Sequence, residues 1–139
     1  MFKFTIHIST LVLCFFSVGQ VTAQVLCMKS VNSNLPIRLK LSLPGEHSSI
    51  GKIKYERGTN EITILRLNEL RLTAKSTVPA AIKTRFSEIV DGTFTGSYFL
   101  TTQGGAVGEL TYQKKNRKKL YKFIDDQESY IGESCNWSN

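Results

Sequence analysis

The chain has 139 residues, with 18 Lys or Arg against 11 Asp or Glu, and its formal net charge is +7 at pH 7. This length fits one domain with a core of modest size, and no repeat or low-complexity tract interrupts it. Beyond the first 23 residues one His remains, His47, and the two Cys there are expected to be oxidised, so a zinc site lacks ligands. No glycine-rich phosphate loop precedes a helix.

The first 23 residues have the pattern of a secretory signal peptide. Lys3 supplies a short basic region, Ile8 to Val18 is mostly apolar, and Val21-Thr22-Ala23 predicts cleavage after Ala23. An uncleaved anchor is the alternative, but the apolar run is shorter than the roughly 20 residues that a spanning helix needs. We therefore expect one exported domain, residues 24–139, of 139 − 23 = 116 residues. Its net charge is 17 − 11 = +6, and cleavage leaves it no transmembrane anchor.

Two cysteines remain in the expected mature chain, Cys27 near its start and Cys135 near its end. In an oxidising compartment such a pair forms a disulfide, and the alternative is two free buried thiols. The bond would enclose a loop of 135 − 27 = 108 residues. Because a disulfide requires close approach of both backbones, this prediction places the first and last mature segments side by side.

The first strands show a clear alternation of apolar and polar residues. In Leu35 to Leu43 five aliphatic side chains share one face, and Pro44-Gly45 ends the strand. Ile50 to Tyr55 alternates in the same way, and residues 57–60 form a turn.

The next strand has an irregular pattern. In Glu61 to Leu67 the alternation slips after Ile64, which indicates a bulge or burial on both faces. A turn at residues 68–69 and another alternating stretch, Leu70 to Ala74, are expected to follow.

Residues 77–90 fit either a helix or a strand. Their apolar residues fall on one helical face, with a proline suited to the first turn. Asp91-Gly92 is a hairpin signal, however, and predicts that Arg85 to Val90 is a strand paired with Thr93 to Thr102. We adopt the strand, preceded by one helical turn at residues 79–82.

A central hairpin spans Thr93 to Tyr112, with Gly104-Gly105 at its turn. Lys114 to Lys118 then turns the chain into a last strand, Leu120 to Ile124. The side chains expected in the core from this region are Phe94, Tyr98, Leu100, Leu110 and Tyr112.

Together these patterns predict an all-β fold, a small antiparallel β-barrel or sandwich of about seven or eight strands with at most one short helix. The disulfide joins the termini. A barrel of this size is filled by its own side chains or holds one small ligand. The Gly-x-Trp pattern of lipocalins is missing near the first strand, because the single Trp is Trp137, and we assign the chain to no family.

The sequence offers little for catalysis. His47 is the one His of the mature chain, in a loop beside two serines, and we read it as a solvated loop residue. Glu88, Asp91 and Glu109 lie in or beside the central strands, where a carboxylate pair would suit glycoside chemistry, but we expect them to face outward. We predict no catalytic residue, no metal site and no cofactor.

A dense basic run is the strongest surface signal. Its members are Lys114, Lys115, Arg117, Lys118, Lys119 and Lys122. At the tip of a hairpin they would attract an anionic partner, although a solvated turn is the plainer interpretation.

We therefore predict a periplasmic or secreted, non-enzymatic binding protein for a protein or an anionic envelope component. An inhibitor or an immunity-type protein would be one form of it. A carrier of a small apolar ligand is the alternative, and a carboxylate-dependent hydrolase ranks last. Because the chain is expected to be exported, nucleic acid is not an expected partner.

Overall fold

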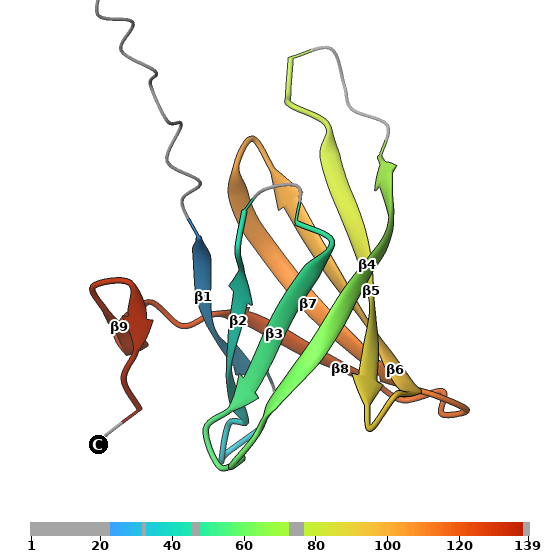
Figure 1. Cartoon of the computed structure of the whole chain (residues 1–139). Helices are drawn as coiled ribbons and strands as arrows, with labels where there is room; N and C mark the ends of the chain where they lie inside the picture. The colour runs from blue at the N-terminus through green and yellow to red at the C-terminus, as the bar shows by residue number, and fades with distance from the viewer. Residues whose placement is uncertain (1–22, 32, 46–47, 73–76, 138–139) are drawn as a thin grey trace, which may run out of the picture.

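The computed structural model describes residues 23–31, 33–45, 48–72 and 77–137, and in this part of the chain eight antiparallel strands close into a barrel (Figure 1). Each strand pairs with the next along the sequence, and β1 pairs with β8. The strands are β1 Gln24–Ser30, β2 Arg38–Leu43, β3 Ile50–Tyr55, β4 Glu61–Arg71, β5 Ala81–Val90, β6 Thr93–Gln103, β7 Ala106–Lys114 and β8 Leu120–Asp125. The predicted all-β fold is confirmed, in its barrel form.

The leader predicted at residues 1–23 lies outside the described residues except for Ala23, and His47 also lies outside them. Within the described ranges, no helix is long and apolar enough to cross a bilayer. The helical element there is a 3-10 turn after β8, η1 Gln127–Ser129.

The barrel is filled by its own side chains through most of its length. Twelve buried residues form one core cluster: Leu26, Met28, Leu39, Leu41, Leu43, Ile53, Ile64, Phe86, Tyr98, Leu100, Leu110 and Phe123. Eight strands give an interior just wide enough for such packing. Truncating one of the buried leucines to Ala is expected to cost about 2–5 kcal/mol.

β2 is shorter than its alternation predicted. The strand begins at Arg38, and the upstream Leu35 and Ile37 side chains are 71% and 46% exposed, so only the last three of the five aliphatic residues reach the core. Pro36 has no N–H to give to a ladder. The Ile37 N–H instead donates to Ser30 Oγ at 2.8 Å, which takes this segment out of the regular pairing.

β4 continues without a break through residues 68–69, so the turn predicted there is wrong. The predicted bulge is confirmed, because the register with β5 shifts between Arg66 and Asn68. The two leucines that flank Arg66 are 37% and 53% exposed, so β4 is not buried on both faces. Since the bulge adds one residue, Arg66 and Glu69 both pair with inward-facing positions of β5.

Residues 81–90 are strand from the first position of β5, so the helical turn predicted at residues 79–82 is wrong. Asp91 and Gly92 join β5 to β6 with φ angles of 49° and 73°, the left-handed pair that the predicted hairpin turn requires.

The sequence also predicted a separate alternating stretch from Leu70 to Ala74. The first two residues of this stretch belong to β4, and residues 73–76 lie outside the described ranges.

Phe94 faces outward, although the alternation of β6 predicted it in the core. The register between β5 and β6 shifts between Glu88 and Ile89, which leaves Thr95 without an opposite residue. The inward and outward faces of β6 therefore exchange at Thr95. Beyond this bulge Tyr98 faces the core, as predicted.

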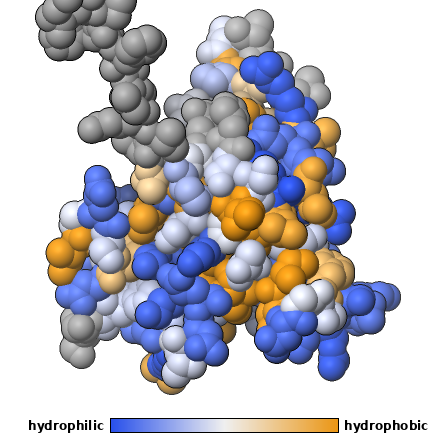
Figure 2. Space-filling view, in the orientation of Figure 1, coloured by the Kyte–Doolittle hydropathy of each residue, from blue (hydrophilic) through white to orange (hydrophobic). Residues whose placement is uncertain are grey.

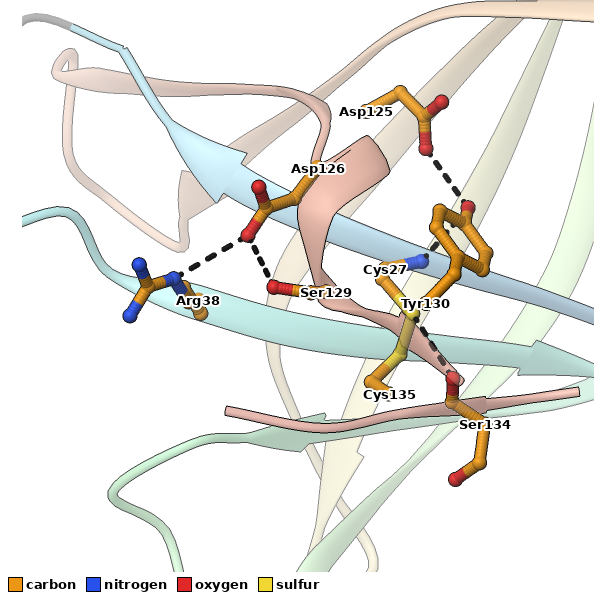
Figure 3. Close-up of a disulfide and its surroundings, with 8 residues drawn as sticks. All are labelled: Cys27, Arg38, Asp125, Asp126, Ser129, Tyr130, Ser134 and Cys135. Carbon is orange, nitrogen blue, oxygen red and sulfur yellow. Dashed lines mark hydrogen bonds and ion pairs between the residues drawn. A yellow bond between two sulfur atoms is a disulfide. The ribbon is translucent and has the colours of Figure 1, made fainter. Parts of the chain in front are cut away.

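The segment after β8, which we call the clasp (residues 126–137), completes the seam between β1 and β8. Only three residue pairs join these two strands. Beyond them the Asp126 N–H donates to Cys27 O at 2.7 Å. The Cys27 N–H donates to Tyr130 Oη at 3.0 Å (Figure 3). The Cys27–Cys135 disulfide fastens the clasp to β1, as the sequence predicted. Two short strands, β9 Tyr130–Ile131 and β10 Ser134–Cys135, pair within it.

The Asp126 carboxylate fixes the clasp to the barrel wall. Its side chain is 1% exposed and lies 3.0 Å from Lys29 Nζ and 3.3 Å from Arg38 Nε. Ser129 Oγ donates a hydrogen bond to it at 2.6 Å (Figure 3). Burial alone would raise the pKa of this carboxyl, but the Ser129 hydrogen bond and the two cations outweigh burial and hold the pKa below its ordinary 3.8. The carboxylate is therefore charged and paired in the folded protein.

Candidate functional site

The turn between β7 and β8 presents five exposed cations, which we call the basic tip: Lys114, Lys115, Arg117, Lys118 and Lys119. Hydrogen bonds hold this turn in place. The Lys115 N–H donates to Thr95 O at 2.8 Å, and the Arg117 N–H donates to Lys114 O at 3.1 Å. Gln113 Nε2 donates to Arg117 O at 3.0 Å. The cations are thus carried by an ordered turn that is tied to β6.

A cleft of about 550 Å³ lies between the basic tip and the outer wall of β5, β6 and β7. Four of the tip cations line this basic cleft, and Arg85 of β5 adds a fifth charge from the opposite wall. Phe94 and Ser97 of β6 also line it. A second, smaller cleft of about 280 Å³ is lined by Lys119, Tyr121 and two of the same tip cations. The basic run of the sequence therefore has shape as well as charge.

Aromatic rings support the cations of the basic cleft. Lys115 Nζ lies 5.6 Å from the centroid of the Phe94 ring, and the Arg85 guanidinium carbon lies 5.8 Å from that of Phe99. Arg85 Nη2 donates to Ser97 Oγ at 3.3 Å. Arg85 Nε is buried and has no hydrogen-bond partner in the described part of the chain. The Arg85 guanidinium is therefore held at the cleft by Ser97 and by the ring of Phe99.

No carboxylate of the described residues forms an ion pair with a cation of the basic tip. Lys122 belongs to the same basic run of the sequence, but unlike the five cations of the basic tip it has an ion-pair partner. It lies on β8 opposite Thr111, and its Nζ forms an ion pair with Glu109 Oε2 at 2.5 Å. The basic tip is thus a group of neighbouring like charges, and Lys122 is neutralised on the wall beside it.

An exposed apolar strip adjoins the basic cleft. It consists of Ile50, Leu65, Ile89 and Phe94 on the outer face of β3 to β6, where Ile50 lies opposite Leu65 and half-buried Ile89 lies opposite half-buried Phe94. Ile50 is 51% and Leu65 37% exposed. Figure 2 shows orange side chains over β4 and β5 on the face toward the viewer, with blue side chains beyond them at the end of the barrel where β7 turns into β8. Phe94 belongs to both the apolar strip and the wall of the basic cleft.

Glu88 is buried inside the barrel at the same end as the basic tip, where the sequence predicted an outward-facing residue. Its carboxylate accepts three hydroxyl hydrogen bonds, from Thr95 Oγ1 at 2.6 Å, Tyr98 Oη at 2.8 Å and Tyr112 Oη at 2.8 Å. A Cβ at Gly96 would lie 2.6 Å from Cε2 of Tyr112, so the glycine makes room for that ring. The spacing of Glu88 from Phe86, two residues apart in one strand, was the signal that places both on one face.

The tyrosines extend this polar cluster across the barrel. Tyr98 Oη donates its one hydroxyl hydrogen bond to Glu88, so Tyr55 is the donor in the 2.8 Å hydrogen bond between Tyr55 and Tyr98. Burial first, and then the neighbouring Tyr55 and Glu88, raise the pKa of Tyr98 far above its ordinary value. Burial and Glu88 also raise the pKa of Tyr112. These phenols therefore stay protonated and act as hydrogen-bond donors.

The three carboxylates weighed for hydrolase chemistry do not come together. Glu88 is inside the barrel with hydroxyl partners, Glu109 pairs with Lys122, and Asp91 lies in the exposed β5–β6 turn. Glycoside hydrolysis needs two carboxyl groups that flank one bond. Among the described residues, no group of three or more His, Cys, Asp or Glu is placed to hold a metal ion.

Comparison of the chain with protein-family models, with curated proteins and with solved structures finds no match.

Proposed function

We propose that this chain is an exported, non-enzymatic binding protein that recognises an acidic protein surface through the basic cleft and the apolar strip. The observation that carries the proposal is the basic cleft, in which Arg85 and four tip cations gather with no carboxylate partner in the described chain. Like charges at this spacing repel one another, and a bound anion relieves that repulsion.

The apolar strip favours a protein over other anionic partners. Protein interfaces combine an apolar centre with a polar rim. Ile50 and Leu65 are exposed on the outer face of the barrel, and Phe94 of the same strip lines the basic cleft. An acidic glycan is polar throughout and would gain little binding energy from contact with the aliphatic side chains of the apolar strip. A bilayer would first meet the protruding lysines, because the apolar strip lies along the barrel wall.

Export is supported by the Cys27–Cys135 disulfide, because such bonds persist in oxidising compartments, and by the predicted leader. A small, filled, disulfide-fastened barrel suits a protein that works by occupying a partner's surface. We infer that the partner is an enzyme, and that binding either inhibits it or protects against it as an immunity protein does.

Charge-neutralising variants test the basic cleft. Replacing Lys114, Lys115, Arg117 and Lys118 by Gln removes four charges that act together on one ligand. Replacing Lys40, Lys54, Arg57 and Arg71 by Gln removes the same net charge elsewhere. On a sulfonated resin we expect the first variant to elute at clearly lower salt than the control variant, because clustered charges bind one polyanion cooperatively. Equal elution of the two variants would contradict a built anion site.

Site-specific photocrosslinking in the native host tests the class of partner. A benzophenone amino acid at Phe94 places the reactive group where the apolar strip meets the basic cleft, and the same amino acid at Ile131, which is 60% exposed on the clasp, is the control. We expect one protein adduct that is specific to position 94, that is lost in the four-cation tip variant and that weakens with ionic strength. Adducts with lipid alone, or protein adducts of equal yield at both positions, would refute an acidic protein partner.

A further inference from the structure

The second half of β4 has an unpaired edge, which we call the β4 edge (residues 67–71). β4 has 11 residues and β3 has six, and their pairing ends where Leu65 lies opposite Ile50. One further contact follows, in which the Arg66 N–H donates to Ser49 O at 2.8 Å. The bulge then bends β4, which continues beside β5 beyond the end of β3 (Figure 1). Among the described residues, no strand pairs with the β4 edge on the side away from β5.

The alternation of hydrogen bonds identifies the backbone groups on the unpaired side. The Leu72 N–H donates to Ala81 O at 2.8 Å, so Leu72 and Leu70 direct their N–H and C=O groups toward β5. Glu69 and Arg71 alternate with them and direct their N–H and C=O groups away from β5. The β4 edge therefore offers donors and acceptors at the spacing that a further antiparallel strand uses, and such an edge is a template for strand addition.

The side chains of the β4 edge are accessible to a partner strand. Leu67 and Leu70 are 53% and 61% exposed. Glu69 and Arg71 project from the face of β4 opposite to that of Leu70. The Glu69 side chain is 42% exposed, and its bond to Arg66 uses only Oε1. Arg71 is exposed and forms no ion pair with a described residue. The edge thus carries a negative charge, an apolar side chain and a positive charge at successive positions.

We infer that the β4 edge binds the same edge of a second copy of this chain and forms a symmetric, antiparallel dimer. When Leu70 lies opposite Leu70 of the second copy, Glu69 of each chain lies opposite Arg71 of the other. In this register the unpaired N–H and C=O groups of Glu69 and Arg71 bond to each other across the dimer axis. A shift by two residues would place Glu69 or Arg71 opposite itself, and like charges directly opposite destabilise a sheet. The charges and the backbone groups therefore select the same register.

The dimer leaves both basic clefts accessible. The β4 edge lies at the end of the barrel where Arg71 is opposite Ile82, whereas the basic tip follows the end of β7 at Lys114, beside the start of β6. Because β6 crosses the barrel between these two ends, the inference does not depend on the proposed function. The paired edges form a small interface, so we expect a weak dimer that forms at high protein concentration. Tests of the basic cleft on dilute protein are unaffected by it.

Sedimentation equilibrium of the mature, disulfide-bonded protein tests this inference. We expect the average mass to rise from that of a monomer toward that of a dimer as the concentration increases from micromolar to millimolar. Arg71→Glu replaces both opposite-charge pairs by like-charge pairs and should raise the dissociation constant of the dimer at least about tenfold. Arg57→Glu, in the exposed turn before β4, makes the same change in net charge and should associate at least as well as the unmodified protein. A monomer at every concentration, or equal dissociation constants for the two variants, would overturn the inference.

A mixture of two charge-reversed variants tests the register. Glu69→Arg and Arg71→Glu each place like charges opposite one another in their own dimers. When the two variants are mixed, the arginines of one chain face the glutamates of the other, and both opposite-charge pairs are restored. We therefore expect the mixture to associate more tightly than either variant alone. If mixing leaves the average mass at that of the separate variants, the proposed register is wrong.

Amide hydrogen exchange gives a measurement that needs no variant. In the unmodified protein, the amide hydrogens of Glu69 and Arg71 should exchange more slowly at millimolar than at micromolar concentration, because the second copy accepts their hydrogen bonds. The amide hydrogen of Leu70, which is bonded to β5, should exchange slowly at both concentrations. If the exchange of Glu69 and Arg71 does not depend on concentration, the β4 edge is not the interface.

Discussion

Replacement of Glu88 by Gln is expected to reveal how strongly the buried polar cluster stabilises the barrel. Glu88 is 5% exposed, and its carboxylate accepts hydrogen bonds from hydroxyl groups at both of its oxygens, with no cation among the residues of the cluster. An amide keeps one acceptor oxygen but turns an NH₂ group toward one of the three donors. The donors stay in place because Tyr98 is held by the core and Thr95 by the bulge.

The magnitude follows from the hydrogen bonds. A hydrogen bond to a charged group contributes about 1.5–3 kcal/mol, against about 1 kcal/mol between neutral groups. Glu88→Gln removes one charged bond and weakens two, and release of the buried charge offsets part of this loss. We expect a net loss of about 2–4 kcal/mol in the free energy of unfolding, which for a domain of this size lowers the Tm by on the order of 10 °C.

Urea unfolding at neutral pH, with the disulfide intact, measures this loss. Glu109→Gln is the matched control, because it makes the same chemical change in a carboxylate whose exposed partner is Lys122. The control should lose no more than about 1 kcal/mol, as exposed ion pairs do. If both variants lost equal stability at an unchanged denaturant slope, the view of Glu88 as a buried anchor would be refuted.

Two further predictions concern the clasp. Replacing both Cys27 and Cys135 by Ser should lower the free energy of unfolding by up to about 4–5 kcal/mol, since the bond closes a 108-residue separation, and a loss below about 1 kcal/mol in urea would contradict this. The folded-state pKa of Asp126 is lowered, so its contribution to stability is complete above its ordinary 3.8 and disappears as the pH falls below that value. Acid titration of Asp126→Asn should therefore show a smaller loss of stability below about pH 4 than the unmodified protein, and parallel curves would refute the role of the Lys29 and Arg38 pairs.

Local patterns predicted the hairpins of this barrel well. Ile50 to Tyr55 alternates because one side of β3 packs in the core, and Asp91-Gly92 and Gly104-Gly105 supply the positive φ angles that their turns need. The disulfide was predictable because two cysteines in an expected exported chain have no other partner. The alternation and the turn residues each lie within a few positions of the sequence, and the disulfide involves the one available pair of cysteines. These features can therefore be recognised without knowing which strands pair.

The failures come from bulges and from pairing partners that the sequence does not reveal. Alternation cannot show that Thr95 is an extra residue, and so it placed Phe94 inside and hid its role in the basic cleft. For Glu88 the two-residue spacing from Phe86 did point to the inner face, but the residue was predicted to face outward because a buried carboxylate needs partners, and its three hydroxyl partners come from β6 and β7. The basic tip was visible as composition, whereas Arg85, which completes the cleft, lies 29 positions before Lys114 in the sequence.

The position of the disulfide determines what a protease can do to this protein. Because the bond joins Cys27 to Cys135, every peptide bond from residue 28 to residue 134 lies inside the covalent ring. A single cut in any hairpin turn would leave both pieces attached to each other, and the strands on either side would remain paired. A nicked molecule would therefore migrate as one species until a reductant is added, and only the reduced sample would separate into two fragments.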